Sequence, residues 1–272
     1  MDPRVGEIAS ALRGSRKYAT LTEGVLQRIA AWALQRHHTT KAALQAARGK
    51  LHQAYGAYLT PGNLTTTERM VAALPAPAAR DAVAQASRAI LARHASSAER
   101  LGFLSDLYPR LLGPPLDLTR VRRILDLACG LHPLALPWMG LSPETEYCAY
   151  DIDERLMRAI GQYLTKAGQS GRAEARDLMA WPGTPALPAA DVVLLLKTVP
   201  CFERQESGAS LRLLQSLEAP CVIVSFPARS LGGREKGMRE QYQETAANLA
   251  RGLGARMERL GFPTETFYRL WR

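Results

Sequence analysis

The sequence predicts an α/β fold in which an all-helical N-terminal region precedes a doubly wound sheet. Two observations carry this prediction. After Gly113, apolar runs of strand length alternate with segments of helical periodicity, which is typical of a mostly parallel sheet covered by helices. Before Gly113, the apolar residues recur at helical spacing. Because such sheets bind ligands beyond the carboxyl ends of their strands, we expect a functional site there.

Residues 1–60 are predicted to be helical throughout. The apolar positions that set the spacing of the first helix are Val5, Ile8, Ala9 and Leu12. Thr22 is expected to cap a second helix, and Thr39 a third helix that runs to Leu59. The proline and glycine in Thr60–Asn63 then end this helix.

Three more helices are predicted before the sheet. The first follows Thr60–Asn63 and is ended by Pro75-Ala76-Pro77. The second covers residues 78–92 and follows this break. The third begins at His94, where two serines offer an N-cap, and runs to about Leu112.

Gly113-Pro114-Pro115 is the clearest boundary in the chain, because two prolines after a glycine form a stiff linker. We therefore expect a helical domain over residues 1–113 and a sheet domain over residues 114–272. The strands predicted in the second domain cover residues 121–127, 146–150, 173–175, 191–196, 221–226 and 265–271. Helices are expected over residues 154–167 and 237–253.

The net charge of +10 is concentrated in the first of these domains. Residues 1–113 hold 15 Lys and Arg against 7 Asp and Glu, a surplus of 8, whereas residues 114–272 hold 20 against 18, a surplus of 2. A general preference for arginine does not explain this asymmetry. A positive surplus on one part of a chain is the electrostatic pattern of nucleic-acid binding.

The cysteine and hydropathy patterns indicate a soluble, cytoplasmic protein. The four cysteines contain no C-x-x-C pair and fall in or beside predicted strands, as expected of reduced core residues. The sequence shows no apolar run of membrane-spanning length and no signal peptide. No metal site is expected, because histidines such as His37 and His38 lack ligand spacing.

The turn after the first predicted strand resembles that of a nucleoside-binding unit. Apolar residues up to Leu127 lead into Ala128-Cys129-Gly130, whose small side chains let a ligand approach the backbone. A dinucleotide site would continue with G-x-x-G, but Pro133 follows and removes an N–H that a pyrophosphate needs. The turn therefore favours a ligand without phosphates, such as S-adenosylmethionine.

Polar residues follow the next three strands. Asp151 and Asp153 come after the second strand, Asp177 after the third and Lys197 after the fourth. In a nucleoside-binding sheet, Asp151 suits the ribose diol and Asp177 the exocyclic amine of adenine. Each could instead be a solvated loop residue, and their joint occurrence favours nucleoside binding.

Four segments resemble the aminoglycoside-resistance 16S ribosomal RNA methyltransferases, which modify N7 of a guanine in the decoding site. The segments are LDLACG (125–130), LKTVPCFE (196–203) followed by Gln205, SFPARSLGG (225–233), and His94-Ala95-Ser96 with Arg100. The third segment is the most specific, because a generic methyltransferase has no reason to contain it. Phe202, where leucine is expected, is a small departure. The resemblance covers nearly the whole chain.

The resemblance implies a Rossmann-like class I methyltransferase sheet that uses S-adenosylmethionine. The cofactor-binding residues that it implies are Tyr58, His94, Ala95, Ser96, Arg100, Ala128, Gly130, Asp151, Asp177, Leu178, Leu196 and Gln205. Among these, Arg100 would reach the methionine carboxylate, because a guanidinium can pair with a carboxylate through two hydrogen bonds. The implied partner is 16S rRNA within the small ribosomal subunit, bound by a monomer that requires neither metal nor membrane.

No catalytic base is expected, because guanine N7 carries an unprotonated lone pair. Methyl transfer to N7 would rest on alignment of donor and acceptor. The candidate RNA-binding residues are Arg16, Lys17, Arg229, Arg234 and Lys236. The first two are expected to contact ribosomal phosphates, and the last three to contact the target nucleotide or its phosphates.

Two other functions fit the same fold. A small-molecule methyltransferase would use the N-terminal helices as a lid, which requires an apolar inner face and no positive surplus. A degenerate methyltransferase fold would hold RNA without binding the methyl donor. A dinucleotide oxidoreductase is disfavoured by the missing G-x-x-G. The residues alone leave open the choice between guanine and a nearby adenine.

Overall fold

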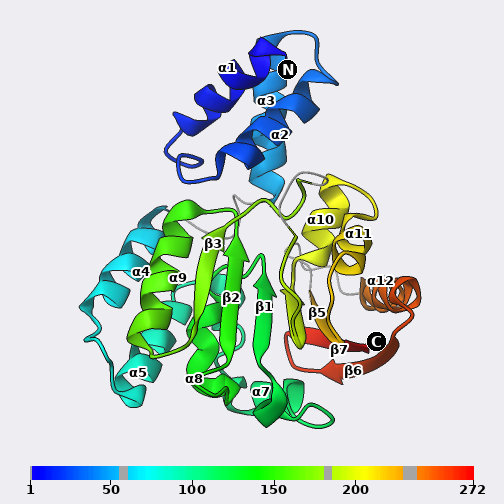
Figure 1. The fold of residues 1–272 in the computed structure, drawn as a ribbon. Helices are drawn as coiled ribbons and strands as arrows, with labels where there is room; N and C mark the ends of the chain where they lie inside the picture. The colour runs from blue at the N-terminus through cyan, green and yellow to red at the C-terminus, as the bar shows by residue number, and fades with distance from the viewer. Residues whose placement is uncertain (1, 55–60, 181–185, 229–237) are drawn as a thin grey trace.

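A seven-stranded sheet forms the centre of the molecule, as seen in a computed structural model that describes residues 2–54, 61–180, 186–228 and 238–272 (Figure 1). The strands are β1 (Arg123–Leu127), β2 (Glu146–Asp151), β3 (Gly171–Ala175), β4 (Val192–Leu196), β5 (Cys221–Pro227), β6 (Arg256–Gly261) and β7 (Glu265–Trp271). Their order in the sheet is β3-β2-β1-β4-β5-β7-β6. The first five strands are parallel, and β7 pairs antiparallel with both β5 and β6.

The predicted α/β class is confirmed, and each of the six predicted strands is present. The central strands are buried except at their ends, because helices cover both faces. In β1, for example, Ile124 belongs to one hydrophobic cluster and Leu125 to another. The additional strand β6 was not predicted from the sequence. This edge strand is mostly exposed and contains only two large apolar residues, Met257 and Leu260, so it carries no buried-strand pattern.

Three N-terminal helices form a bundle with a core of its own. They are α1 (Pro3–Arg13), α2 (Glu23–Leu34) and α3 (Thr40–Ala54). Their fully buried residues, such as Ile8, Leu26 and Ile29, pack in one cluster that the sheet does not share. Figure 1 shows this bundle above the carboxyl ends of the parallel strands.

The next helices pack on the sheet itself. They are α4 (Pro61–Ala73), α5 (Arg80–Leu91), the short α6 (Ala95–Ala98) and α7 (Leu104–Leu111). Val71, Ile90 and Leu107 share a hydrophobic cluster with Ile124 of β1. The hydrophobic core therefore divides near residues 54–61, and the predicted boundary at Gly113 does not separate two cores.

The remaining helices cover the sheet further along the chain. They are α8 (Leu136–Met139), α9 (Glu154–Lys166), α10 (Val199–Gln205), α11 (Ala209–Gln215) and α12 (Met238–Leu253), with short 3-10 turns η1 (Leu118–Arg120) and η2 (His132–Ala135). Asp153 caps α9 by accepting hydrogen bonds from the backbone N–H groups of Arg155 and Leu156 at 2.9 and 2.8 Å.

Two helical predictions were wrong in detail. The helix expected from His94 to Leu112 is two helices, because the chain turns at Gly102 and Phe103 stacks on Phe262 with ring centroids 5.3 Å apart. Thr22 precedes α2, but its side chain makes no capping hydrogen bond. Its backbone N–H instead donates to Ile152 O at 3.0 Å and ties the bundle to the end of β2. The end of the helix predicted to reach Leu59 lies outside the described residues.

Candidate functional site

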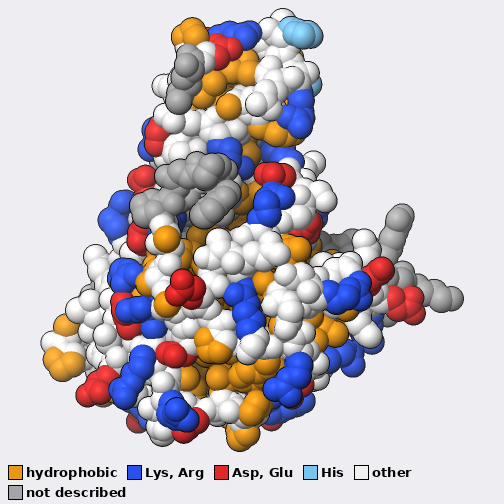
Figure 2. Space-filling view, turned by 45° about the vertical axis from the view of Figure 1, so that its right-hand side comes forward, with side chains coloured by type: hydrophobic (Ala, Val, Ile, Leu, Met, Phe, Trp, Pro, Cys, Tyr) orange, Lys and Arg blue, Asp and Glu red, His pale blue; other side chains and the backbone are white. Residues whose placement is uncertain are grey.

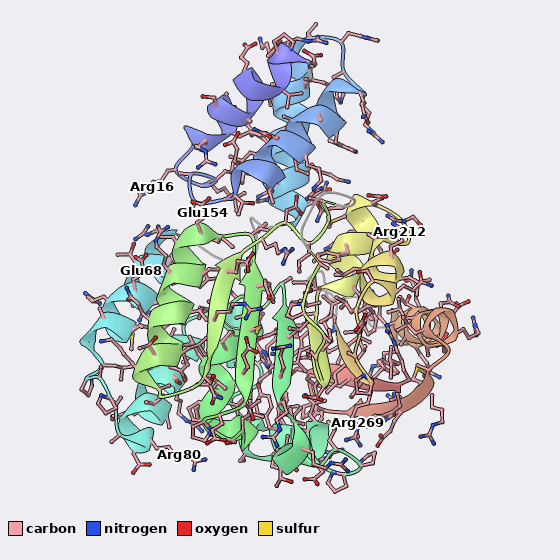
Figure 3. All side chains as sticks on the ribbon, viewed as in Figure 1. Arg16, Glu68, Arg80, Glu154, Arg212 and Arg269 are labelled. Carbon is pink, nitrogen blue, oxygen red and sulfur yellow. The ribbon has the colours of Figure 1, made fainter. Side chains whose placement is uncertain are left out.

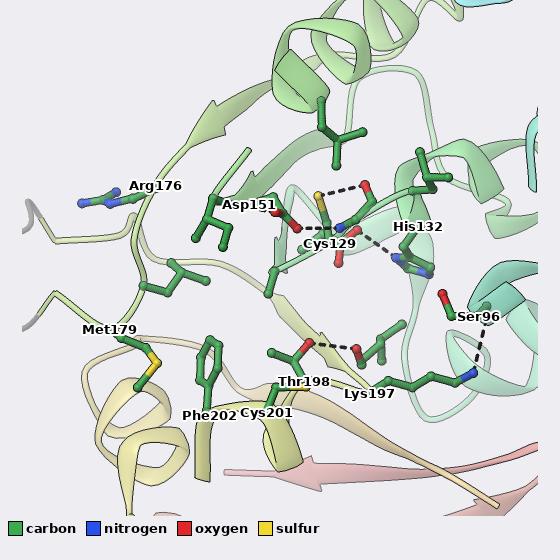
Figure 4. A pocket seen from close by; sticks show the side chains of 18 of the residues that line it. Ser96, Cys129, His132, Asp151, Arg176, Met179, Lys197, Thr198, Cys201 and Phe202 are labelled. Atoms are coloured by element: carbon green, nitrogen blue, oxygen red, sulfur yellow. Dashed lines mark hydrogen bonds and ion pairs between the residues drawn. The ribbon is translucent and has the colours of Figure 1, made fainter. Parts of the chain in front are cut away.

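A pocket lies between the carboxyl ends of the parallel strands and the N-terminal bundle. Figure 4 shows Asp151, Cys129 and His132 on one side of it, and Met179, Phe202 and Lys197 on the other. The bundle supplies Val25, Arg28 and Leu51. The pocket therefore stands where the sheet topology predicts a ligand, and the bundle forms part of its wall.

Ten of the twelve predicted cofactor-binding residues line this pocket. They are His94, Ser96, Arg100, Ala128, Gly130, Asp151, Asp177, Leu178, Leu196 and Gln205. Ala95 is not among the lining residues, although it lies between two residues of α6 and its cap that are. Tyr58 falls outside the described residues. The structure thus brings these residues together, while their binding role stays a prediction.

The turn between β1 and η2 is shaped by two left-handed residues, Ala128 (φ 51°) and Gly130 (φ 53°). Gly130 N–H donates to Asp151 Oδ2 at 2.8 Å, and Ile152 N–H donates to Asp151 Oδ1 at 2.7 Å. A Cβ at Gly130 would meet no atom within 4 Å, so the space beside the turn is open. Burial raises the pKa of Asp151 to about 6, although these two N–H groups oppose the shift.

Asp177 is paired with a residue of the bundle. Arg28 Nε donates to Asp177 Oδ2 at 2.6 Å and Arg28 Nη2 to Oδ1 at 3.1 Å, while Met179 N–H donates to Oδ1 at 3.0 Å. No motif in the sequence marks Arg28 as a partner of Asp177, which lies 149 residues away. An adenine amine at Asp177 would share the carboxylate with Arg28.

Arg100 also lines the pocket and is almost completely buried, with 8% of its surface exposed. Its guanidinium makes two hydrogen bonds of 2.7 Å to Glu265 of β7, a residue that the sequence analysis did not single out. His94 lies nearby, and its Nδ1 is 2.9 Å from Ser96 Oγ. Burial, with a contribution from Lys197, lowers the pKa of His94, so the ring is neutral at pH 7.

A buried hydrogen-bond network lies beneath the turn. His132 Nδ1 is 2.8 Å from Asp126 Oδ2, which also accepts from Tyr147 OH at 2.6 Å. Tyr108 OH is 2.9 Å from His132 Nε2. The network fixes Asp126 and His132 in the pocket wall.

Two buried polar atoms in the pocket wall have no hydrogen-bond partner among the described residues. They are His94 Nε2 and Asp126 Oδ1. A buried polar atom without a partner costs free energy, so a polar ligand that paired with these atoms would gain affinity. The pocket therefore offers a ligand these two polar atoms, one on His94 and one on Asp126.

The predicted RNA-binding residues are placed only in part. Arg16 is exposed, and Figure 3 shows it at the outer edge of the bundle. Lys17 Nζ is 2.7 Å from His52 Nδ1, so it is partly tied to α3. Arg229, Arg234 and Lys236 fall outside the described residues. In the view of Figure 2, Lys and Arg side chains are spread over both the bundle and the sheet part.

Neither a metal cluster nor a membrane helix is found in the described ranges. Within residues 2–54, 61–180, 186–228 and 238–272, His, Cys, Asp and Glu form no group of three or more that could hold a metal ion. The helices in these ranges are too short or too polar to cross a bilayer. The four cysteines are buried, and none of them forms a disulfide.

Comparisons with known proteins point to one family. The family model described as "Ribosomal RNA methyltransferase (FmrO)" matches residues 14–268. A relative from Micromonospora rosea, named 16S rRNA (guanine(1405)-N(7))-methyltransferase, is 37% identical over 272 residues, which cover 98% of this chain and 96% of the relative. A protein of the same name from Serratia marcescens is 35% identical, with 93% of this chain and 92% of the relative covered.

Solved structures agree with the sequence relatives. The 16S rRNA methyltransferase RmtF in complex with S-adenosyl-L-homocysteine has a TM-score of 0.82 and 31% identity, over 100% of this chain and 99% of the other. The 16S rRNA methylase RmtB has a TM-score of 0.78 and 28% identity, with 98% of each chain covered. The Rossmann-like methyltransferase sheet predicted from the sequence is thus confirmed.

Proposed function

The chain belongs to the FmrO family of ribosomal RNA methyltransferases, and from this premise we propose that it methylates N7 of guanine 1405 in 16S rRNA. The methyl donor is S-adenosylmethionine, and the substrate is the rRNA within the small ribosomal subunit. Methylation there confers aminoglycoside resistance. The observation that carries the proposal is the pocket at the carboxyl ends of β1, β2 and β4, which gathers Gly130, Asp151 and Arg100.

In this proposal, the chemistry of each pocket residue suits one part of the cofactor. Asp151 accepts hydrogen bonds from the ribose hydroxyls, and Asp177 from the adenine amine. Arg100 donates to the methionine carboxylate. Leu178 packs beside the base, and Gln205 lines the side of the methyl donor.

The bound cofactor supplies a sulfonium methyl group, and guanine N7 receives it through its own lone pair. No residue has to remove a proton from N7, so the chain acts by holding donor and acceptor in line. Alignment of this kind can contribute roughly 7–11 kcal/mol to catalysis. To expose N7, the guanine leaves its stack and is held by apolar or aromatic residues near the pocket. Phe202 is one such residue in the pocket wall.

The charge of the α1–α3 bundle supports ribosome docking. Residues 1–54 hold 9 Lys and Arg against 3 Asp and Glu, a surplus of 6 out of the net +10 of the chain. Contacts from Arg16, Lys17 and similar side chains to rRNA phosphates provide affinity that depends on salt. Arg229, Arg234 and Lys236 act at the target nucleotide in this proposal, and one monomer carries both functions.

One observation favours the alternative of a small-molecule methyltransferase with a helical lid. Val25 and Leu51 of the bundle are apolar and line the pocket, as a lid would. A lid has no need of the positive surplus on the same bundle, however, and the family match concerns ribosomal RNA. We therefore favour the ribosomal substrate.

Methyl transfer to purified small subunits tests the proposal directly. We expect radiolabel from S-adenosylmethionine to enter 16S rRNA at one guanine, mapped by reverse transcription after borohydride and aniline cleavage at N7-methylguanine. Naked 16S rRNA and large subunits serve as substrate controls. Label at an adenine, or label only in small molecules of a cell extract, would refute the assignment.

Cofactor affinity should depend on pH through Asp151. The pKa of Asp151 is raised to about 6, so the carboxyl is protonated below this pH and loses an acceptor for the ribose. We expect the affinity for S-adenosylhomocysteine to be constant above pH 7 and to fall by up to about tenfold per pH unit below pH 6. Calorimetry between pH 5 and 8 measures this, and the Asp151→Asn variant should bind weakly with a flatter profile. An unchanged slope in that variant would assign the titration to another group.

A further inference from the structure

We propose that Glu265 is a positioning residue for the cofactor, because it holds Arg100 in the orientation that receives the methionine carboxylate. This inference rests on the proposed function and adds to it a residue from the antiparallel end of the sheet. Glu265 is the first residue of β7 and is fully buried. It is 165 residues from Arg100 in the sequence.

The hydrogen bonds between the two side chains use one edge of the guanidinium. Arg100 Nε donates to Glu265 Oε2 and Arg100 Nη2 to Oε1, both at 2.7 Å. Nη1 makes no hydrogen bond to any described residue, and Arg100 lines the pocket. A guanidinium has five N–H donors in one plane, so the edge formed by Nη1 and Nη2 can still take a second carboxylate through two hydrogen bonds. Arg100 can therefore bridge Glu265 and the cofactor.

Glu265 is itself held in place from two other elements. Ser225 Oγ of β5 donates to Oε1 of Glu265, and Lys197 Nζ, after β4, lies 3.5 Å from Oε2. Ser225 Oγ also accepts from the backbone N–H of Lys197 at 2.9 Å. The carboxylate orientation is thus determined by β5, β7 and the end of β4.

The charges around Arg100, Lys197 and Glu265 suit an anionic ligand. Arg100 and Lys197 carry two positive charges, and the fully buried Glu265 carries one negative charge. Two other acidic groups act on these three side chains. Glu99 is 2.7 Å from Lys197 Nζ, but its side chain is 44% exposed and is screened by water, whereas the buried Asp126 is paired with His132 Nδ1 at 2.8 Å. A ligand carboxylate would balance the buried charges, whereas without Glu265 the guanidinium would be buried with no fixed partner.

The test compares two ligands that share the nucleoside. S-adenosylhomocysteine carries the carboxylate, and 5′-methylthioadenosine lacks it. In the Glu265→Gln variant, we expect calorimetry to show a loss of about tenfold to hundredfold in affinity for S-adenosylhomocysteine and no change for 5′-methylthioadenosine. An equal loss for both ligands would show a merely structural role and overturn the inference, as would unchanged affinity for S-adenosylhomocysteine.

A matched control lies on the same hairpin. Glu258 of β6 makes a similar two-bond pair with Arg269, at 3.0 and 2.7 Å, and lies outside the pocket. Glu258→Gln should leave both affinities unchanged. If Glu265→Gln does not fold, Ser225→Ala removes one hydrogen bond to Glu265 and should lower only the affinity for S-adenosylhomocysteine, by a smaller factor; equal affinities would overturn the inference. Failure of the wild-type protein to bind S-adenosylhomocysteine would overturn the proposed function as well.

Discussion

The Asp151→Ala variant should bind S-adenosylhomocysteine at least about a hundredfold more weakly than the wild-type protein. The carboxylate offers acceptors for two ribose hydroxyls, and each hydrogen bond to a charged group contributes about 1.5–3 kcal/mol. The same side chain also holds the N–H groups of Gly130 and Ile152, so its loss loosens the turn against which the cofactor lies. Calorimetry measures the affinity, and methyl transfer should fall with it at cofactor concentrations below saturation.

A control variant at a second aspartate distinguishes the loss of ribose binding from the loss of backbone hydrogen bonds. Asp191 Oδ2 accepts from the N–H groups of Arg122 and Arg123 at 2.7 and 2.9 Å, at the amino end of β1. Asp191→Ala removes a comparable pair of bonds away from the pocket, and we expect it to lower the melting temperature without weakening cofactor binding. If the two alanine variants lose the same affinity, Asp151 has no specific role toward the ribose.

The double variant Arg16→Glu/Lys17→Glu should dissociate from small ribosomal subunits far more readily while it binds the cofactor normally. Two positive charges near phosphates become two negative charges, so attraction is replaced by repulsion. We expect the affinity for subunits to fall by about a hundredfold at moderate salt. The plot of the logarithm of the association constant against the logarithm of the salt concentration should become less steep, by about two in the magnitude of its slope. Filter binding or sedimentation over a salt series measures both quantities.

The control for this variant reverses two charges at the other end of the molecule. Arg120 and Arg122 are exposed beside the amino end of β1, opposite the bundle. Arg120→Glu/Arg122→Glu changes the net charge equally, and we expect little effect on subunit binding apart from long-range attraction. Equal losses in both variants would mean that the overall charge, and not the bundle, governs docking.

The fold class and the place of the site followed from the sequence alone. Strands and helices alternate with clear periodicity after Gly113, and parallel strands bring their carboxyl ends to one edge of the sheet. Residues directly after strands, such as Gly130, Asp151 and Asp177, could therefore be assigned to one pocket before any coordinates. The order of strands and helices along the chain is sufficient for this inference, because each of these residues is positioned by the strand that it follows.

Tertiary packing decided which side chains complete that pocket. Arg28 of the bundle pairs with Asp177, and Glu265 of the last strand pairs with Arg100. Lys50 of α3 donates to the carbonyls of Arg204 and Gln205 at 3.0 and 3.1 Å and joins the bundle to α10. These contacts link residues roughly 150 positions apart, and neither periodicity nor a motif marks them. Their physical reason is that packing of the bundle and of the last strands against the pocket buries Asp177, Arg100 and Glu265, and a buried charge requires a partner.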